Sequence, residues 1–259
     1  MRKFIFKSFV ELTGNPTVSS LLKSFSQSKI SKPFVRPFSS TFKLNEQEME
    51  KSLDNYKSIH DLFTRKLVPS ARPISNDDKS IISPVDGVVN ALGPIHADQT
   101  FYVKQQLYNL KELLGSKEAA KRYEEGYYIV LYLSPSHYHR IHYPVTGQLV
   151  KRWALGETSY PVNRLGEKYG ERIFSKNYRI ISELQTQERT SALIKVGALN
   201  INSICLTNAN RLFNKGDELG FFSFGSTVIL LFEKECKFIP TVKNGQEIKM
   251  GQSIGEAAI

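Results

Sequence analysis

From residue 81 to the end, short apolar runs alternate with turn residues, and this pattern constrains the fold more than any other sequence feature. The runs are rich in β-branched and aromatic residues and cover 81–82, 85–89, 127–133, 148–153, 192–196, 201–206, 221–224 and 228–232. Runs of this composition between turn signals are typical of β-strands. Residues 110–123 are the exception, because their leucines and alanines are spaced as in a helix. The sequence therefore predicts a β-rich core.

The first third of the chain shows helical spacing instead. Apolar residues recur at intervals of three and four over 5–12, 18–25 and 46–66, and Pro69 and Pro73 mark a connection to the core. A length of 259 residues suits one large domain with an appendage. We therefore predict an α+β protein in which amphipathic helices precede the β-rich core.

Most of the net positive charge lies near the N-terminus. The whole chain carries 35 Lys and Arg against 25 Asp and Glu, a net charge of +10. Residues 1–43 contain one acid, Glu11, and eight basic residues: Arg2, Lys3, Lys7, Lys23, Lys29, Lys32, Arg36 and Lys43. Such a segment favours a polyanionic partner.

The apolar residues of this segment point to a lipid surface as that partner. They are Phe4, Ile5, Phe6, Phe9, Val10, Leu21, Leu22 and Phe25. Basic helices with an apolar stripe can lie in a membrane interface. Since no nucleic-acid motif accompanies the charge, we do not expect nucleic acid as a partner. The alternative is that the helices pack on the core and leave a solvated basic face.

Neither a membrane-spanning helix nor a secretory signal is expected. No apolar run approaches the roughly 18–20 residues that a spanning helix needs. Lys7 and Glu11 interrupt the apolar region of a signal peptide. Two cysteines, Cys205 and Cys236, are too few for a disulfide scaffold or a zinc ribbon and suit a reducing compartment.

Three of the five histidines, His137, His139 and His142, fall within six residues just after the apolar run 127–133. Imidazoles at short spacing suit zinc, but no second group of ligands appears elsewhere. Acid–base catalysis is the preferred interpretation, and polar surface or core histidines remain the alternative.

Gly225, Ser226 and Thr227 lead into the apolar run 228–232. From these residues alone, a turn or bulge with a permissive glycine is the favoured interpretation. The alternative is chemical: a serine hydroxyl held in a strained turn can attack the preceding glycine carbonyl, which no Cβ obstructs, and convert the amide to an ester.

Five blocks of sequence occur in the order found in one enzyme family. They are Asp61-Leu62-Phe63-Thr64-Arg65, Ala71-Arg72-Pro73-Ile74, Ser83-Pro84-Val85-Asp86-Gly87, Tyr138-His139-Arg140-Ile141-His142 and the stretch 215–227. Over residues 46–259 the chain resembles the phosphatidylserine decarboxylases, pyruvoyl-dependent enzymes made as proenzymes. It departs from the family at Gln105, where glycine usually follows the lysine, and this puts the local turn in doubt.

The resemblance implies a self-processing triad of Ser226, His142 and Asp86. Cleavage between Gly225 and Ser226 would give a β chain of 1–225 and an α chain of 226–259, with Ser226 converted to the pyruvoyl cofactor. It also implies that His139 protonates the carbon left by CO2, with His142 as the alternative donor, and that no metal takes part. His137 matches no functional position. From local sequence alone, Asp86 would be an Asx-turn residue.

The resemblance further implies the fold, substrate and location. We expect a core of barrel-sandwich type at 46–259, preceded by membrane-association helices at 1–45, with the α and β chains staying associated. The substrate would be phosphatidylserine in an anionic membrane, converted to phosphatidylethanolamine at the cytoplasmic face of the cell membrane by a peripheral protein. A homodimer of processed protomers is compatible with the resemblance.

Two other functions compete with this interpretation. A zinc hydrolase would use His137, His139, His142 and Asp86 as ligands. A non-catalytic membrane-binding module would use the β core only as a scaffold, and its bond between Gly225 and Ser226 would stay intact.

Overall fold

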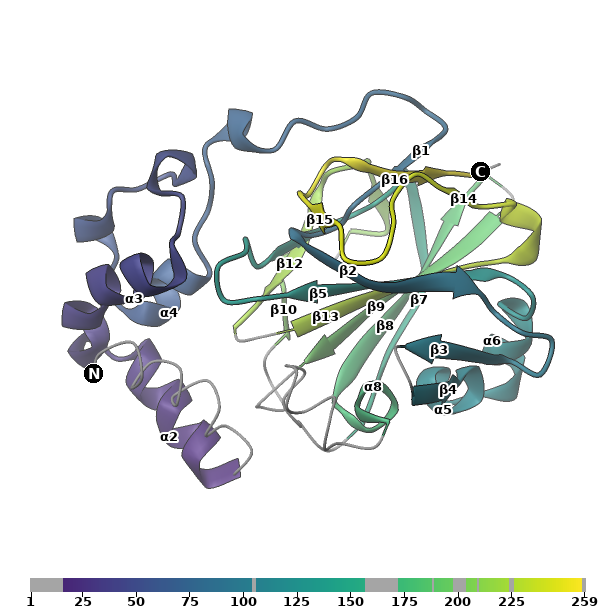
Figure 1. Cartoon of the computed structure of the whole chain (residues 1–259), viewed down its shortest axis with the longest axis horizontal. Helices are drawn as coiled ribbons and strands as arrows, with labels where there is room; N and C mark the ends of the chain where they lie inside the picture. The colour runs from purple at the N-terminus through teal and green to yellow at the C-terminus, as the bar shows by residue number, and fades with distance from the viewer. Residues whose placement is uncertain are drawn as a thin grey trace.

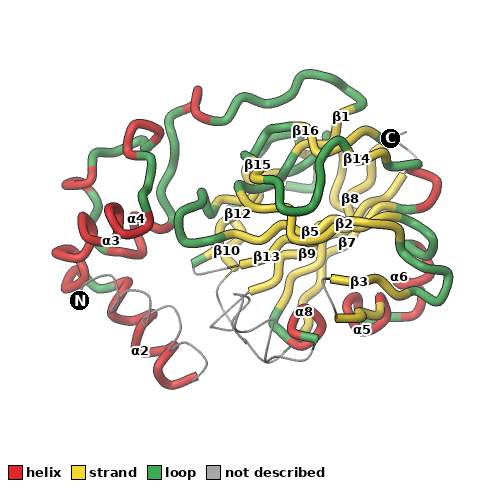
Figure 2. The backbone as a smooth tube through the Cα atoms, viewed as in Figure 1, coloured by secondary structure: helices red, strands yellow, loops and turns green. Residues whose placement is uncertain are grey.

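A helical unit lies beside a larger β-rich body in the computed structural model of the chain (Figure 1). The structure describes residues 16–103, 106–156, 172–187, 189–197, 204–208, 210–223 and 226–257. The helical unit contains α2 (Pro16–Gln27), η2 (Lys29–Phe34), α3 (Val35–Phe42), η3 (Glu46–Glu48), η4 (Leu53–Asn55) and α4 (Ile59–Phe63). A long connection that includes η5 (Pro69–Ala71) leads from it to the β-rich body (Figure 2).

The helical unit has its own hydrophobic cluster. Its buried members are Val35, Phe38, Leu44, Met49, Leu53, Tyr56, Ile59, Leu62 and Phe63. Side-chain hydrogen bonds fix its short elements: Ser58 caps α4 by accepting from the Asp61 amide, and Ser31 Oγ accepts from the Ile59 amide at 3.0 Å. The cluster includes residues on both sides of position 45, so packing is continuous across the predicted domain boundary. The division into two domains at that position stays a prediction.

An antiparallel sheet of eight strands forms the centre of the β-rich body. Its order is β11 (Leu212–Phe213), β7 (Gly147–Leu155), β8 (Arg179–Thr186), β9 (Arg189–Gly197), β13 (Ser226–Phe232), β5 (Tyr127–Leu133), β2 (Gly87–Pro94) and β15 (Glu247–Ile248). Every residue of β13 is buried. This central place follows from an almost wholly apolar strand, because both of its faces must be covered.

Two smaller sheets cover one face of the large sheet. One is β1 (Ser80–Ile82), β16 (Ser253–Glu256) and β14 (Ile239–Pro240), and the other is β10 (Ile204–Leu206), β12 (Glu218–Phe222) and β6 (Arg140–His142). Ile254, Phe222 and Ile141 from these sheets share a hydrophobic cluster with Val228 and Leu230. We call this side of β13 the sheet-covered face.

Helices and a hairpin cover the opposite face. They are α5 (Leu110–Leu114), α6 (Lys117–Arg122), α8 (Ile173–Lys176) and the pair β3 (Thr100–Val103) and β4 (Gln106–Asn109), which share a second cluster with Ile229 and Leu231. The α+β class with helices before a β-rich core is confirmed. The layered part of the expected barrel-sandwich is present, and within the described residues none of the sheets closes into a barrel.

Residues 46–66 are predicted as one or two helices and residues 110–123 as one helix, and both segments are more interrupted in the structure. Residues 46–66 form two 3-10 turns and only one short α-helix, because the backbone is extended at Met49, which bridges Leu67. Residues 110–123 form two helices, since Gly115 ends the first with φ of 79° and Ser116 caps the second by accepting from the Ala119 amide. The predicted helix before residue 13 lies outside the described residues.

In the part of the chain that the structure describes, no helix has both the length and the apolarity needed to cross a membrane.

Candidate active site

Ser226 is the first residue of β13, the central strand. It pairs with Leu133 of β5 and with Gly197 of β9. Because side chains alternate along a strand, Ser226 shares the sheet-covered face with Val228. The residue is fully buried, and its Oγ has no hydrogen-bond partner among the described residues. Gly225, on the other side of the expected cleavage point, lies outside the described residues.

The loop that carries the histidines begins where β5 ends, beside Ser226. At its other end, the Phe222 amide donates to the His139 carbonyl at 2.9 Å. Ser226 pairs with Leu133, the residue just before the loop 134–139, and Phe222 bonds to His139 at the end of that loop. The fold therefore places Ser226 and Phe222 beside the two ends of the histidine loop.

His139 is fully buried and packs against Phe63 of α4, with ring centroids 3.8 Å apart and the ring planes tilted by 33°. Its Nδ1 lies 2.9 Å from the His137 carbonyl oxygen, which can only accept, so Nδ1 carries the proton and Nε2 the lone pair. Nε2 is buried without a partner among the described residues. Burial and the positive charge of Arg65 hold the pKa of His139 well below its usual value, so the ring is neutral at pH 7.

His142 ends β6 and is oriented by a backbone carbonyl. Its Nδ1 donates to Gly216 O at 2.8 Å, which leaves the lone pair on Nε2, 3.2 Å from the hydroxyl of Tyr138. Gly216 has φ of 88°, a conformation that favours glycine, and an added Cβ would meet Ile74 at 2.9 Å. Burial lowers the pKa of His142 and raises that of Tyr138, so the phenol keeps its proton and can donate it to Nε2.

Asp86 lies close to this histidine but bonds to Arg72. Arg72 Nε and Nη2 donate to the two carboxylate oxygens at 2.8 and 2.6 Å, and the Met250 amide donates to Oδ1. The His142 amide donates to Pro84 O at 2.8 Å, which places the turn of Asp86 beside β6. Gly216 O, rather than Asp86, is therefore the hydrogen-bond partner of His142 Nδ1, and Arg72, which bonds to Asp86, lies over the Tyr138 ring.

Comparison with known proteins identifies the family of the chain. The family model described as phosphatidylserine decarboxylase matches residues 59–256. The chain belongs to the phosphatidylserine decarboxylase family. Relatives named phosphatidylserine decarboxylase proenzyme include one from Halalkalibacterium halodurans, 46% identical over 255 residues, and one from Geobacillus kaustophilus, 45% identical over 256. These matches cover 98% of this chain in both cases and 98% and 97% of the two relatives.

The three histidines of this family member have separate partners. His137 accepts from the Ser134 amide at Nδ1 and lies 3.5 Å from Glu247 at Nε2. His139 and His142 bond to two different carbonyls. Over the described ranges, no three His, Cys, Asp or Glu side chains gather as a metal site would require.

Three further side chains, which local sequence patterns did not single out, contact the predicted site residues or their loop. Arg72 holds Asp86, Tyr138 contacts His142, and Arg65 bonds to the loop that carries His139. All three lie inside the sequence blocks that carry the family resemblance, which is the signal that could have found them. Arg72 bonds to Asp86, which is 14 residues away in the sequence, and Arg65 bonds to residues about 70 positions away. Local sequence patterns do not show such contacts.

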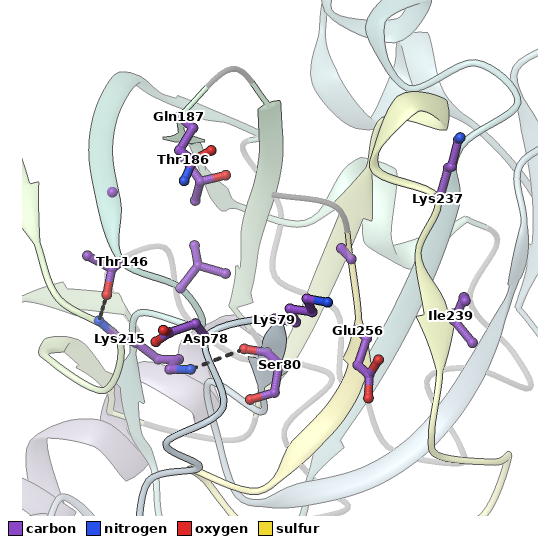
Figure 3. A pocket seen from close by; sticks show the side chains of 13 residues that line it. Asp78, Lys79, Ser80, Thr146, Thr186, Gln187, Lys215, Lys237, Ile239 and Glu256 are labelled. Carbon is purple, nitrogen blue, oxygen red and sulfur yellow. Dashed lines mark hydrogen bonds between the residues drawn. The ribbon is translucent and has the colours of Figure 1, made fainter.

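A surface pocket of about 720 Å³ lies away from these residues (Figure 3). Its lining includes Thr186 and Gln187 at the end of β8, whereas Ser226 lies near the other end of the sheet, where Arg179 of β8 pairs with Val196. Lys215 from the turn beside Gly216 also lines it and donates to Asp77 O and Ser80 O. Lys215 thus connects the pocket to the turn whose Gly216 bonds to His142, and we assign the pocket no part in the chemistry.

Proposed function

We propose that this chain is a proenzyme that cleaves itself between Gly225 and Ser226 and then decarboxylates phosphatidylserine to phosphatidylethanolamine. The observation that carries the proposal is the Ser226 hydroxyl at the start of the central strand, which is fully buried and has no partner in the part of the chain that the structure describes. An unsatisfied buried polar group costs about 1–3 kcal/mol. A serine retained at such a cost, beside a loop of histidines, supports a chemical role.

Self-cleavage needs a base for the Ser226 hydroxyl, and we assign that role to His142. Its Nε2 holds the lone pair, because Nδ1 donates to Gly216 O, and the hydrogen bond that Nε2 accepts from Tyr138 must break before it can take the serine proton. The serine oxygen adds to the Gly225 carbonyl, and the C–N bond breaks as the ester C–O bond forms. Elimination then breaks the bond between Cβ and Oγ, and hydrolysis of the new dehydroalanine end releases ammonia. Asp86, held by Arg72, would stabilise the charged imidazole at a distance.

The position of Ser226 fits a pyruvoyl group, because the group is made from that residue and its buried place excludes bulk water. When present, the group supplies an electron sink for the pair left by departing CO2.

His139 is the chain's own proton carrier in this proposal. Since its pKa is depressed, the ring is neutral and must accept a proton before it can donate one. The amine of the lipid substrate is an ammonium at neutral pH, and Nε2 carries a lone pair that no described residue engages. We assign to Nε2 both acceptance of a proton from this ammonium and its delivery to the substrate carbon after CO2 leaves.

The two chains should stay together after cleavage because they share sheets. β13 of the α chain lies between β9 and β5 of the β chain, and β15 and β16 pair with β2 and β1. The apolar residues 228–232 are at most 1% exposed, and burial of five such side chains contributes on the order of 10 kcal/mol. Cys205 and Cys236, the single cysteines of the two chains, are both free thiols.

Electrophoresis of freshly made protein tests this proposal. Under denaturing, reducing conditions we expect two fragments, the smaller being residues 226–259 with a mass that fits a ketone-bearing end. On native size exclusion, the same fragments should elute as one species. A single intact chain after prolonged incubation would contradict self-cleavage, and separate elution of the fragments would contradict the shared sheets.

A peripheral place on an anionic membrane is the second part of the proposal. Leu21 on α2 is 71% exposed and Ile30 on η2 is 73% exposed, while Phe25 packs on the cluster of the helical unit. Lys23, Lys29 and Lys32 lie on the same two elements. Apolar side chains beside basic ones suit an interface with anionic lipid. The cytoplasmic face and a homodimer of processed protomers are proposed on the family resemblance alone.

Paired substitutions test the membrane contact. Leu21→Ser with Ile30→Ser should leave cleavage at Ser226 intact, because both side chains are exposed, and should weaken binding to phosphatidylserine vesicles several-fold. The matched control is Leu212→Ser with Ile239→Ser, whose side chains are 73% and 66% exposed outside the helical unit. Deletion of residues 1–30 should weaken binding further. Equal vesicle binding by the wild-type chain and the deletion would refute the membrane role.

A further inference from the structure

Arg65 has buried polar atoms that the described residues leave unsatisfied. It follows α4 and is 5% exposed. Its Nη2 donates to the carbonyls of Ser136 and His137 at 2.9 and 3.0 Å. Its Nε and Nη1 are buried without a partner among the described residues. An arginine needed only to hold the loop would not require two further donors in a place where water is excluded.

The unpartnered donors belong to the site of His139. Arg65 Nη2 and His139 Nδ1 bond to the same oxygen, the carbonyl of His137, so guanidinium and imidazole are neighbours. His139 Nε2 is also buried and has no partner among the described residues. The nearby acids form their ion pairs with other cations: Asp86 with Arg72, and Glu48 with Arg72 and Lys249. A buried cation without an ion pair of its own among the described residues, beside the proposed proton carrier, suits an anionic ligand.

We propose that Arg65 binds the phosphodiester of the lipid substrate through Nε and Nη1. This inference rests on the proposed function, because it takes His139 as the group beside the reacting carbon. Two N–H groups of a planar guanidinium match two oxygens of a phosphate in a bidentate pair. The phosphorus is joined to the reacting carbon through one methylene and one oxygen, so the phosphate must lie near any group that contacts that carbon.

The other anion of the substrate is its carboxylate, and the chemistry argues against it as the ligand of Arg65. The carboxylate loses its charge as it leaves as CO2. An ion pair to it would therefore stabilise the bound substrate more than the transition state and would slow the reaction. The phosphodiester keeps its charge throughout, so binding it holds the lipid in place without raising the barrier.

A neutral substrate analogue separates these assignments. Turnover by self-processed full-length protein would be measured in mixed micelles with phosphatidylserine and with its phosphate methyl triester, which has no charge on phosphorus. Arg65→Gln retains donors for the two loop carbonyls but removes the cation. For phosphatidylserine we expect kcat/KM to fall about 10- to 100-fold, mainly through KM. For the triester we expect a change of less than about two-fold.

Two further variants complete the experiment. Lys234→Gln removes one positive charge from an exposed pair with Glu125 and should leave both substrates unaffected. Arg65→Lys keeps the charge without the planar fork and should give a smaller loss with the same preference for the charged substrate. If the Arg65→Gln variant does not cleave itself, the comparison of the two substrates is made with the Arg65→Lys variant instead.

Equal losses with both substrates would overturn the phosphate assignment in favour of the carboxylate or of a structural role. An unchanged kcat/KM for phosphatidylserine would also overturn it. Failure of the proposed function is distinguishable, because wild-type protein would then turn over neither substrate.

Discussion

Replacement of Ser226 with alanine is expected to leave one full-length chain without decarboxylase activity. The variant lacks the only atom that can attack the Gly225 carbonyl in this proposal, and without cleavage no electrophile forms. The substitution should fold, because Ser226 Oγ makes no hydrogen bond to the described residues and its place is buried. Denaturing electrophoresis, intact mass and release of CO2 from labelled phosphatidylserine measure the three consequences.

Thr227→Val is the matched control for this experiment. Thr227 is also buried, with a hydroxyl that bonds to none of the described residues, but alternation along β13 places it on the opposite face, with Ile229. We expect this variant to cleave and to decarboxylate. Cleavage of Ser226→Ala, or loss of cleavage in Thr227→Val with the fold retained, would show that the hydroxyl of Ser226 is not the nucleophile.

Replacement of His139 and of His142 with alanine should have different consequences. His142→Ala removes the proposed base for Ser226, so we expect uncleaved protein or cleavage slowed by about 10² to 10⁴. His139→Ala removes the proton carrier of the later reaction, so we expect cleavage to be largely retained and turnover to fall by about 10² to 10⁴. The two assays are the fraction of cleaved chain over time and CO2 release from the protein that has cleaved.

His96→Ala serves as the control, because His96 is exposed and lies outside the loop and β6. It should match wild-type protein in both assays. Loss of cleavage in His139→Ala together with normal cleavage in His142→Ala would mean that the two roles are exchanged. Loss of cleavage in both variants would point instead to a shared role in folding, since both rings are buried.

Strands whose residues are apolar throughout were predictable from sequence. The predicted run 127–133 is β5, and 228–232 lies within β13. Strand β8 was missed, because it carries Ser182 and Glu183 at buried positions. Tertiary contacts give these buried polar side chains their partners: Lys195 donates to Ser182 Oγ at 2.6 Å, and Arg122 pairs with Glu183 at 3.2 Å. A polar residue in a buried strand depends on partners from other elements, which local sequence patterns do not reveal.

The α+β class, the family and the short set of residues on which the chemistry is proposed follow from the sequence, because apolar periodicity and ordered motifs are local properties of the chain. How those residues are connected is visible only in three dimensions. It shows that Gly216 orients His142, that Arg72 holds Asp86 and that Arg65 lies beside His139. Ring tautomer, ion pairing and an unsatisfied buried donor each depend on which atoms lie within about 3 Å, and the partners come from segments far apart in the sequence.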